Sequence, residues 1–155
     1  MRKGYSELVE TYPQLELDAQ LCLPLYAASR GVTRRYTELL HELDLTYPQY
    51  VTMLALWDAG EPLTVGEIGE RLHLDSGTLT PVLKRLEAAG RVTRTRDPED
   101  ERRVLVASTA EGLRLRAEVA QMPERAWASM GLEPAEGEQL RVLLHRLIGG
   151  LDSAG

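Results

Sequence analysis

The chain has 155 residues, 43% hydrophobic side chains and a net charge of −6 at pH 7, which suits a globular domain with a packed core. No run approaches the ~18 uninterrupted apolar residues of a membrane span, and the N-terminus lacks the apolar centre of a signal peptide, so we expect a cytoplasmic protein without a membrane partner. The single cysteine excludes an internal disulfide, so any redox role must use the thiol itself or a group from another molecule.

The N-terminal third predicts two helices after a polar arm. Apolar residues recur with a helical period from about Asp18 to Leu43, which predicts a long first helix. Thr46 is a suitable N-cap for a second helix, with Pro48 in its first turn and Gly60 at its end.

Residues 64–92, TVGEIGERLHLDSGTLTPVLKRLEAAGRV, predict a helix-turn-helix. Thr64 and Glu67 have the spacing of a capping box, and apolar residues follow at helical intervals up to a tight polar turn. Asp75 or Ser76 can cap the second helix, and a glycine after its last turn ends it.

The second of these helices has one apolar stripe and one small, polar face. Such a face lets the start of the helix approach base edges and thymine methyl groups, while basic residues further along fall where phosphates lie. The candidate DNA-binding residues of this helix are Ser76, Gly77, Thr78, Thr80, Pro81, Lys84 and Arg85. The alternative is an ordinary amphipathic surface helix, which also has a polar face.

The next stretch, RVTRTRDPEDERRVLVAST, predicts a β-hairpin around the turn at residues 97–100. A helix-turn-helix followed by such a hairpin is a winged helix. Arginines near the tip can enter a minor groove, and those on the strand can reach phosphates. The candidate DNA-binding residues of the hairpin are Arg94, Arg96, Arg102 and Arg103. Alternatively, acidic neighbours can pair with these arginines. We expect the arginines both to pair with acidic residues and to bind DNA, with Asp100 supporting the wing.

The charge of this region differs from that of the whole chain. Residues 84–103 contain seven basic and five acidic side chains, although the protein as a whole is acidic. A small basic footprint on an acidic protein predicts specific, salt-dependent binding to double-stranded DNA, with little nonspecific association.

The C-terminal part predicts further helices. Thr109 starts a helix that runs to about Met130, and Pro123 should split it near Gln121. Glu133-Pro134 opens a last helix with an apolar face. Nothing left in the sequence covers this face and the first helix at once, so we expect a homodimer that reads a palindromic operator.

The predicted fold is therefore mainly α with a small β-wing, a winged helix-turn-helix with N- and C-terminal dimerisation helices. The expected parts are an N-terminal arm with the first, dimerising and sensing helix, a DNA-binding domain, and C-terminal dimerisation helices: residues 1–45, 46–108 and 109–155.

Three stretches of the sequence resemble a known family. GEIGERLHLDSGTLTPVLKRLEAAGRVTRTRDPEDERRVLVASTAEG is similar to the winged helix of MarR-family bacterial transcriptional regulators. DLTYPQYVTMLALW and LCLPLYAASR resemble the organic hydroperoxide resistance regulators (OhrR) of that family. The resemblance implies a transcriptional repressor, without catalytic activity or a cofactor, that controls the gene of a peroxide-detoxifying enzyme.

Cys22 lies near the start of the first helix. Tyr26 is on the same helix face, whereas Tyr36 returns to nearly that face ~21 Å further along. In an antiparallel pair of first helices, Tyr36 of one chain approaches Cys22 of the other, and Tyr47 can join it. Phenol donors and the helix N-terminus favour a thiolate, the form that attacks peroxides. The OhrR resemblance implies the same roles: Cys22 as redox sensor, with Tyr26, Tyr36 and Tyr47 in its pocket.

We hypothesise that an organic hydroperoxide oxidises Cys22 to a sulfenic acid, shifts the dimer interface and releases DNA. Because the chain has no second cysteine, it should resemble the single-cysteine type, whose oxidised sulfur is capped by a small thiol or a cyclic sulfenamide. Pro24 disfavours a helical Leu23, so the first helix begins or kinks there, which either favours the thiolate or disturbs the pocket.

Other readings remain open at this point. Cys22 can be an inert buried thiol, and tyrosines at helical spacing are more often core residues. A MarR regulator can also respond to a small aromatic ligand bound between the dimer arms. A thiol peroxidase lacks support, since there is no resolving cysteine and no helper histidine or arginine in LCLPLY. No metal site is predicted, because Cys22, His41, His73 and His145 lack ligand spacing.

Overall fold

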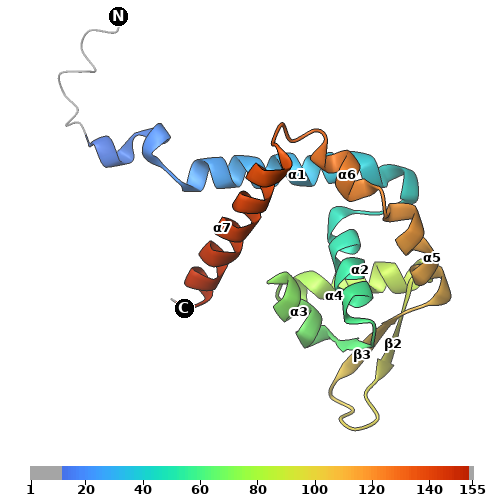
Figure 1. The fold of residues 1–155 in the computed structure, drawn as a ribbon. Helices are drawn as coiled ribbons and strands as arrows, with labels where there is room; N and C mark the ends of the chain where they lie inside the picture. The colour runs from blue at the N-terminus through green and yellow to red at the C-terminus, as the bar shows by residue number, and fades with distance from the viewer. Residues whose placement is uncertain (1–11, 154–155) are drawn as a thin grey trace, which may run out of the picture.

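Helices dominate the computed structural model, which describes residues 12–153 (Figure 1). The elements in chain order are η1 (Pro13–Leu15), η2 (Leu17–Ala19), α1 (Cys22–Leu40), η3 (His41–Leu43), α2 (Tyr47–Ala59), β1 (Leu63–Thr64), α3 (Val65–Leu72), α4 (Ser76–Ala88), β2 (Val92–Arg96), β3 (Val104–Ser108), α5 (Ala110–Val119), α6 (Met122–Trp127) and α7 (Pro134–Asp152). The strands form one antiparallel sheet in the order β1-β3-β2. The predicted fold class, mainly helical with a small wing, is confirmed.

The first long helix begins later than its apolar period predicts. The short 3-10 turns η1 and η2 occupy the residues before Cys22, and the side-chain amide of Gln20 donates to the Gln14 and Glu16 carbonyls at 2.7 and 3.1 Å. Pro24 therefore lies in the first turn of α1, where its missing N–H removes no helical hydrogen bond. The helix is not broken by this proline, and Cys22 becomes its first residue.

Side-chain caps set the starts of the helix-turn-helix helices. The Thr64 hydroxyl accepts from the Glu67 N–H at 3.2 Å, while the Glu67 carboxylate accepts from the Thr64 N–H at 2.7 Å. Asp75, rather than Ser76, is the N-cap of α4 and accepts from the Thr78 N–H at 2.9 Å. Each cap satisfies a backbone donor that the helix leaves unpaired, so the predicted boundaries are confirmed.

The hydrophobic core is centred on the winged helix and extends into α5 and α6. Its largest fully buried apolar side chains come from α1, α2, α3, α4 and β3: Leu40, Met53, Ile68, Leu79, Leu83, Leu86 and Val106. The hairpin strands β2 and β3 pair from Val92↔Ser108 to Arg96↔Val104, and β1 adds a short third strand through Leu63↔Val106. This third strand was not predicted, because two residues are too few to show an alternating pattern.

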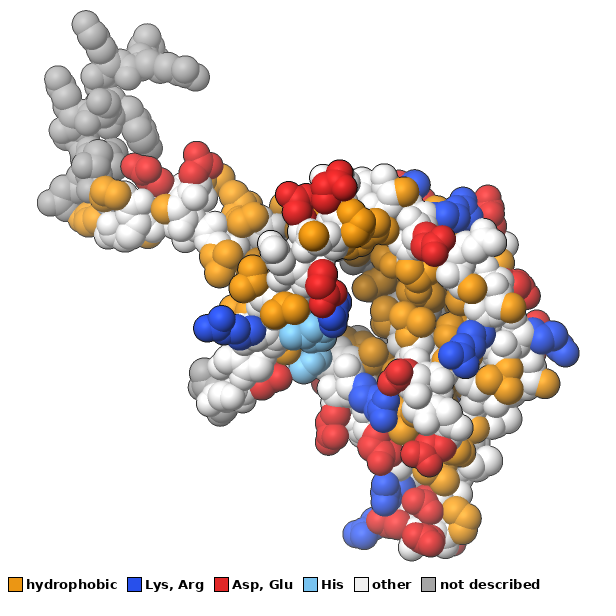
Figure 2. Space-filling view, in the orientation of Figure 1, with side chains coloured by type: hydrophobic (Ala, Val, Ile, Leu, Met, Phe, Trp, Pro, Cys, Tyr) orange, Lys and Arg blue, Asp and Glu red, His pale blue; other side chains and the backbone are white. Residues whose placement is uncertain are grey.

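Of the C-terminal helices, α5 packs on α2 and β3, α6 packs on α1, and α7 meets the winged helix at the ion pair between His73 Nδ1 and Asp152 Oδ2 at 3.6 Å (Figure 1). Pro123 separates α5 from α6 at Gln121, as predicted. Apolar side chains remain exposed on the N-terminal arm, the start of α1 and α7 (Figure 2): Leu15, Leu17, Leu21, Leu23, Tyr26, Leu140, Val142, Leu143, Ile148 and Leu151. No helix in the described part of the chain has the length and hydropathy that a membrane span requires.

Gly112, in the first turn of α5, lies against the backbone that precedes β2. A Cβ at this position would be 2.1 Å from the carbonyl oxygen of Arg91 and 3.1 Å from Cε of Met53. Since a hydrogen-bonded backbone cannot move aside easily, we expect Gly112→Ala to lower the free energy of unfolding by about 1–3 kcal/mol.

Urea unfolding measures this effect. Gly66→Ala in α3 is the matched control, because its Cβ would meet its nearest atom at 3.9 Å and alanine favours a helix. The control should be neutral or stabilising by up to about 1 kcal/mol. Equal stability of the two variants would contradict the close approach at Gly112.

Candidate nucleic-acid interface and thiol site

The face of α4 that the sequence predicts for DNA is open to solvent. Leu79, Leu83 and Leu86 of the apolar stripe are at most 1% exposed. The opposite face is free, and all its candidates except the half-buried Thr80 are exposed: Ser76, Gly77, Thr78, Pro81, Lys84 and Arg85. The start of a short helix, presented by a rigid core, is the geometry that enters a major groove.

Two hydroxyls on this face are already hydrogen-bonded within the helix. Thr78 Oγ1 donates to Asp75 Oδ2 at 2.7 Å, and Thr80 Oγ1 donates to the Ser76 carbonyl at 2.6 Å. The hydroxyl and backbone donors of Thr78 hold the pKa of Asp75 below its usual value. The helix start is therefore ordered before any ligand arrives, and each hydroxyl oxygen keeps acceptor capacity for DNA.

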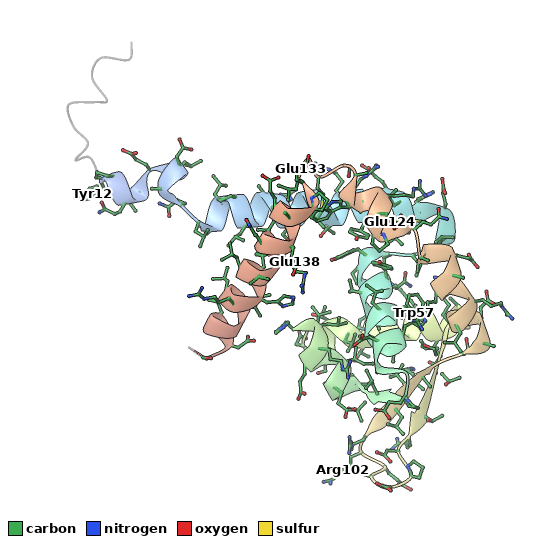
Figure 3. The ribbon with its side chains drawn as sticks, viewed as in Figure 1. Tyr12, Trp57, Arg102, Glu124, Glu133 and Glu138 are labelled. Atoms are coloured by element: carbon green, nitrogen blue, oxygen red, sulfur yellow. The ribbon has the colours of Figure 1, made fainter. Side chains whose placement is uncertain are left out.

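One of the predicted arginines stands fully in solvent at the tip of the wing. Figure 3 shows Arg102 at the far end of the β2–β3 hairpin, where its side chain is 90% exposed. Asp100 accepts from Arg102 Nε at 3.0 Å and from its backbone N–H at 3.1 Å. These bonds lower the pKa of Asp100. The pair orders the tip while leaving the guanidinium accessible to an anion.

Arg94 faces inward rather than outward. Its Nε and Nη2 donate to Glu87 Oε2 at 2.9 and 2.7 Å, and its side chain is only 26% exposed. This pair ties strand β2 to the last turns of α4. Sequence reasoning missed Glu87, because its spacing from Arg94 crosses a turn and follows no helical or strand period.

The remaining wing arginines also make contacts within the hairpin. Arg96 Nη1 donates to the Glu101 carbonyl at 2.9 Å, and Arg103 Nε lies 3.8 Å from Asp97 Oδ2. Asp97 is nearly buried, and its other oxygen accepts from the Glu99 N–H at 2.9 Å. Both arginines are exposed and can still turn toward a phosphate.

The predicted thiol site is divided between the two ends of α1. Cys22 is exposed at the first residue of the helix. Near it, Tyr26 is bound by Arg30, whose Nη1 donates to the phenol oxygen at 3.1 Å and whose guanidinium carbon lies 5.5 Å from the ring centre. Tyr36 lies fourteen residues after Cys22 on the same continuous helix, ~21 Å along the axis.

Tyr36 and Tyr47 form an aromatic cluster with Tyr50, at the opposite end of α1 from the thiol. The ring centres of Tyr36 and Tyr47 are 5.5 Å apart, and Tyr50 stacks on Tyr36 at 5.4 Å. Burial raises the pKa of all three phenols, that of Tyr50 to about 12. Tyr50 is not among the predicted pocket residues, and its place in the cluster depends on how α1 packs on α2.

This arrangement defines a winged-helix DNA-binding protein, with a free recognition helix, an arginine at the wing tip and exposed apolar arms. Residues 45–104 match the MarR family. The organic hydroperoxide resistance transcriptional regulator of Bacillus subtilis is 46% identical over 132 residues, 85% of this chain and 87% of that protein. The chain therefore belongs to the MarR family of DNA-binding transcriptional regulators, which are not enzymes.

Solved structures give the same fold. Reduced AbfR bound to DNA, a Staphylococcus epidermidis protein, matches with a TM-score of 0.78 and 33% identity over 91% of this chain and 96% of that chain. Its disulfide-formed state matches with a TM-score of 0.60 and 37% identity over 88% and 95%. BpsR of Bordetella bronchiseptica, whose DNA binding is regulated by 6-hydroxynicotinic acid, matches with a TM-score of 0.78 and 27% identity over 89% and 97%.

The phenol cluster makes the free energy of unfolding depend on pH in the alkaline range. Tyr50 holds its proton up to about pH 12 in the folded state, whereas an exposed tyrosine loses it near pH ~10. The stabilisation is therefore complete below pH ~10 and is lost as the pH rises through the folded value. Tyr50→Phe cannot ionise, so we expect its stability relative to wild type to improve between about pH 9 and about pH 11.

Urea unfolding at the two pH values measures the change. Tyr26→Phe is the control, because Tyr26 is exposed and outside the cluster. A difference between Tyr50→Phe and wild type that is the same at both pH values would contradict the buried phenol.

Proposed function

We propose that the protein is a homodimeric repressor that binds a palindromic operator and releases it when an organic hydroperoxide oxidises Cys22. One observation carries the proposal: an exposed thiol at the N-terminus of α1 and a half-buried phenol pair at its other end, in a chain 46% identical to a hydroperoxide resistance regulator. The three predicted parts would have separate roles. Residues 1–45 would sense the peroxide and help to form the dimer, residues 46–108 would bind DNA, and residues 109–155 would complete the dimer interface.

Dimerisation explains the uncovered apolar surface. The start of α1 and the length of α7 expose leucines that a single chain leaves in water, such as Leu21 and Leu151 at 66% and 65%. Two copies related by a two-fold axis bury these faces against each other. If the α1 helices pair antiparallel, the Tyr36 and Tyr47 phenols of one protomer meet the Cys22 thiol of the other.

The phenols suit a role as donors to a thiolate. Because burial raises the pKa of Tyr36 and Tyr47, both stay protonated at neutral pH and can donate hydrogen bonds. The helix N-terminus at Cys22 adds the positive end of the helix dipole. Both would place hydrogen-bond donors at the sulfur that attacks the peroxide.

The proposed reaction begins with attack of the Cys22 thiolate on the terminal oxygen of a hydroperoxide, ROOH. A sulfur–oxygen bond forms, the O–O bond breaks, and the departing alkoxide takes up a proton as the alcohol ROH. The sulfur loses two electrons to become a sulfenic acid, and the peroxide gains them. A small thiol or a backbone nitrogen then condenses with the sulfenic acid and releases water, since the chain has no second cysteine.

On DNA, we propose that α4 lies in the major groove and the wing follows the adjacent minor groove. Ser76, Gly77, Thr78, Thr80 and Pro81 would face base edges, with Lys84 and Arg85 at phosphates. Arg102 would enter the minor groove with Asp100 as its support, Arg96 and Arg103 would reach phosphates, and Arg94 would brace α4. The higher TM-score with reduced, DNA-bound AbfR than with its disulfide form supports assigning the described conformation to the DNA-binding state.

A second candidate function is release by a small aromatic acid. A cavity of about 700 Å³ lies between α1 and the segment from the end of α6 into α7, with apolar walls and arginines at its edge, among them Arg34. Its size suits such a ligand, and BpsR responds to 6-hydroxynicotinic acid. Release of Cys22→Ser from DNA by an aromatic acid, without oxidant, would favour this function over peroxide sensing.

The peroxide proposal predicts a clear difference between Cys22→Ser and wild type. A palindromic operator selected with reduced protein is titrated before and after treatment with cumene hydroperoxide. Wild-type affinity should fall on the order of tenfold to a hundredfold, because the oxidised interface no longer holds the two α4 helices at the operator spacing. Cys22→Ser should bind as tightly as reduced wild type, with or without oxidant. Release of the serine variant by peroxide would contradict the assignment.

The wing proposal predicts a change in salt dependence. Arg102→Ala removes the exposed tip cation, so operator binding should weaken by about 1–3 kcal/mol, and the slope of log Kd against log salt should become shallower by roughly one per protomer. Arg114→Ala on α5 is the control, since Arg114 is exposed but paired with Glu111 away from the wing. An unchanged slope in Arg102→Ala would exclude a tip contact to DNA.

A further inference from the structure

Arg91 connects two parts of the fold that are far apart in the sequence. Its guanidinium lies at the corner between α1 and α2, where Nη2 donates to the Leu43 carbonyl at 2.7 Å and Nη1 donates to the Asp44 carbonyl at 2.9 Å. Asp44 is left-handed, with φ of 48°, and ends the 3-10 extension of α1. The side chain therefore bonds two carbonyls that the helix leaves unpaired.

The backbone of Arg91 belongs to the DNA-binding part. Its N–H donates to the Leu86 carbonyl in the last turn of α4 at 2.9 Å, and its own carbonyl accepts from the Thr109 N–H at 3.1 Å. The Thr109 hydroxyl also donates to the Gly90 carbonyl at 2.6 Å. One residue thus ties the end of the recognition helix and the start of α5 to the end of α1.

These bonds are stronger than ordinary surface contacts. A guanidinium donates charge-assisted hydrogen bonds, and the carbonyls at a helix C-terminus carry the negative end of the helix dipole. Because both donors belong to one planar guanidinium and bind adjacent carbonyls, they fix the orientation of the group as well as its distance from the backbone. A displacement of the corner therefore moves Arg91, and with it the end of α4.

The corner is also where the phenol cluster lies. Tyr47 follows Asp44 by three residues at the start of α2, and its ring contacts Tyr36 in α1. Leu45, between them, is 4% exposed and fixes the corner in the core. Beside the apolar core that α2 and α4 share, the Arg91 side chain is therefore a directed polar link from the phenol corner to α4.

We propose that Arg91 is the positioning residue that couples the phenol cluster to the recognition helix. The inference rests on the proposed function and names the element that carries the oxidation signal. When oxidation of Cys22 alters its contacts with the partner's phenols, the corner shifts, and the two hydrogen bonds of Arg91 transmit the shift to α4. Without these bonds, oxidation still occurs, but the DNA-binding head no longer follows it.

The test compares operator Kd before and after cumene hydroperoxide in wild type, Arg91→Leu, Arg91→Lys and the control Arg114→Leu. Dimedone labelling followed by mass spectrometry measures sulfenic acid at Cys22 in the same samples. Arg91→Leu should form sulfenic acid at the wild-type rate, and its own reduced Kd is the reference for its oxidised Kd. Its ratio of oxidised to reduced Kd should fall from the wild-type value, on the order of tenfold or more, toward one.

Arg91→Lys keeps the charge but only one donor group, so its ratio should be intermediate, and Arg114→Leu should match wild type. If thermal melts show that Arg91→Leu is unfolded, the ratio of oxidised to reduced Kd in Arg91→Lys becomes the test of the coupling role. A wild-type ratio in the Arg91 variants, with normal oxidation of Cys22, would overturn the coupling role alone. Wild-type protein that peroxide oxidises but does not release would instead overturn the proposed function.

Discussion

The proposed sensing depends on the length and continuity of α1. An unbroken helix from Cys22 to Leu40 places the thiol ~21 Å from the Tyr36 phenol of the same chain, and no side-chain rotation closes that distance. The thiol and the phenols can meet only if a second chain supplies one of them. In the proposed mechanism, dimerisation and sensing therefore both depend on this one helix, and the apolar residues that a single chain leaves exposed at its start lie beside the thiol.

Side-chain pairs tie the elements of the DNA-binding part to one another. The Glu87–Arg94 pair joins α4 to β2, and the Asp100–Arg102 pair orders the hairpin tip. Arg91 then links this body to the α1–α2 corner. Because packed cores shift between discrete arrangements rather than deform continuously, a small displacement at the corner changes the position of the whole recognition helix.

The local features of the fold could be predicted from the sequence, since capping residues, helical periods and prolines act over a few residues. Thr64, Asp75 and Pro123 each mark a boundary where the structure has one. The start of α1 was placed too early, because the 3-10 turns before Cys22 continue the apolar period without α-helical hydrogen bonds. The inward turn of Arg94 and the stacking of Tyr50 depend on tertiary packing, and the proposed thiol site requires a second chain. The spacing of residues in the sequence indicates neither the tertiary packing nor the contact with a second chain.

A mixed dimer tests the central claim most directly. One chain carries Cys22→Ser with both phenols intact, and the other carries Tyr36→Phe and Tyr47→Phe with its thiol intact. If the site is completed across the dimer, the remaining thiol faces intact phenols, and its sulfenic acid should form at the wild-type rate, faster than in the homodimer of the double tyrosine variant. An oxidation rate in the mixed dimer as slow as in that homodimer would contradict the account.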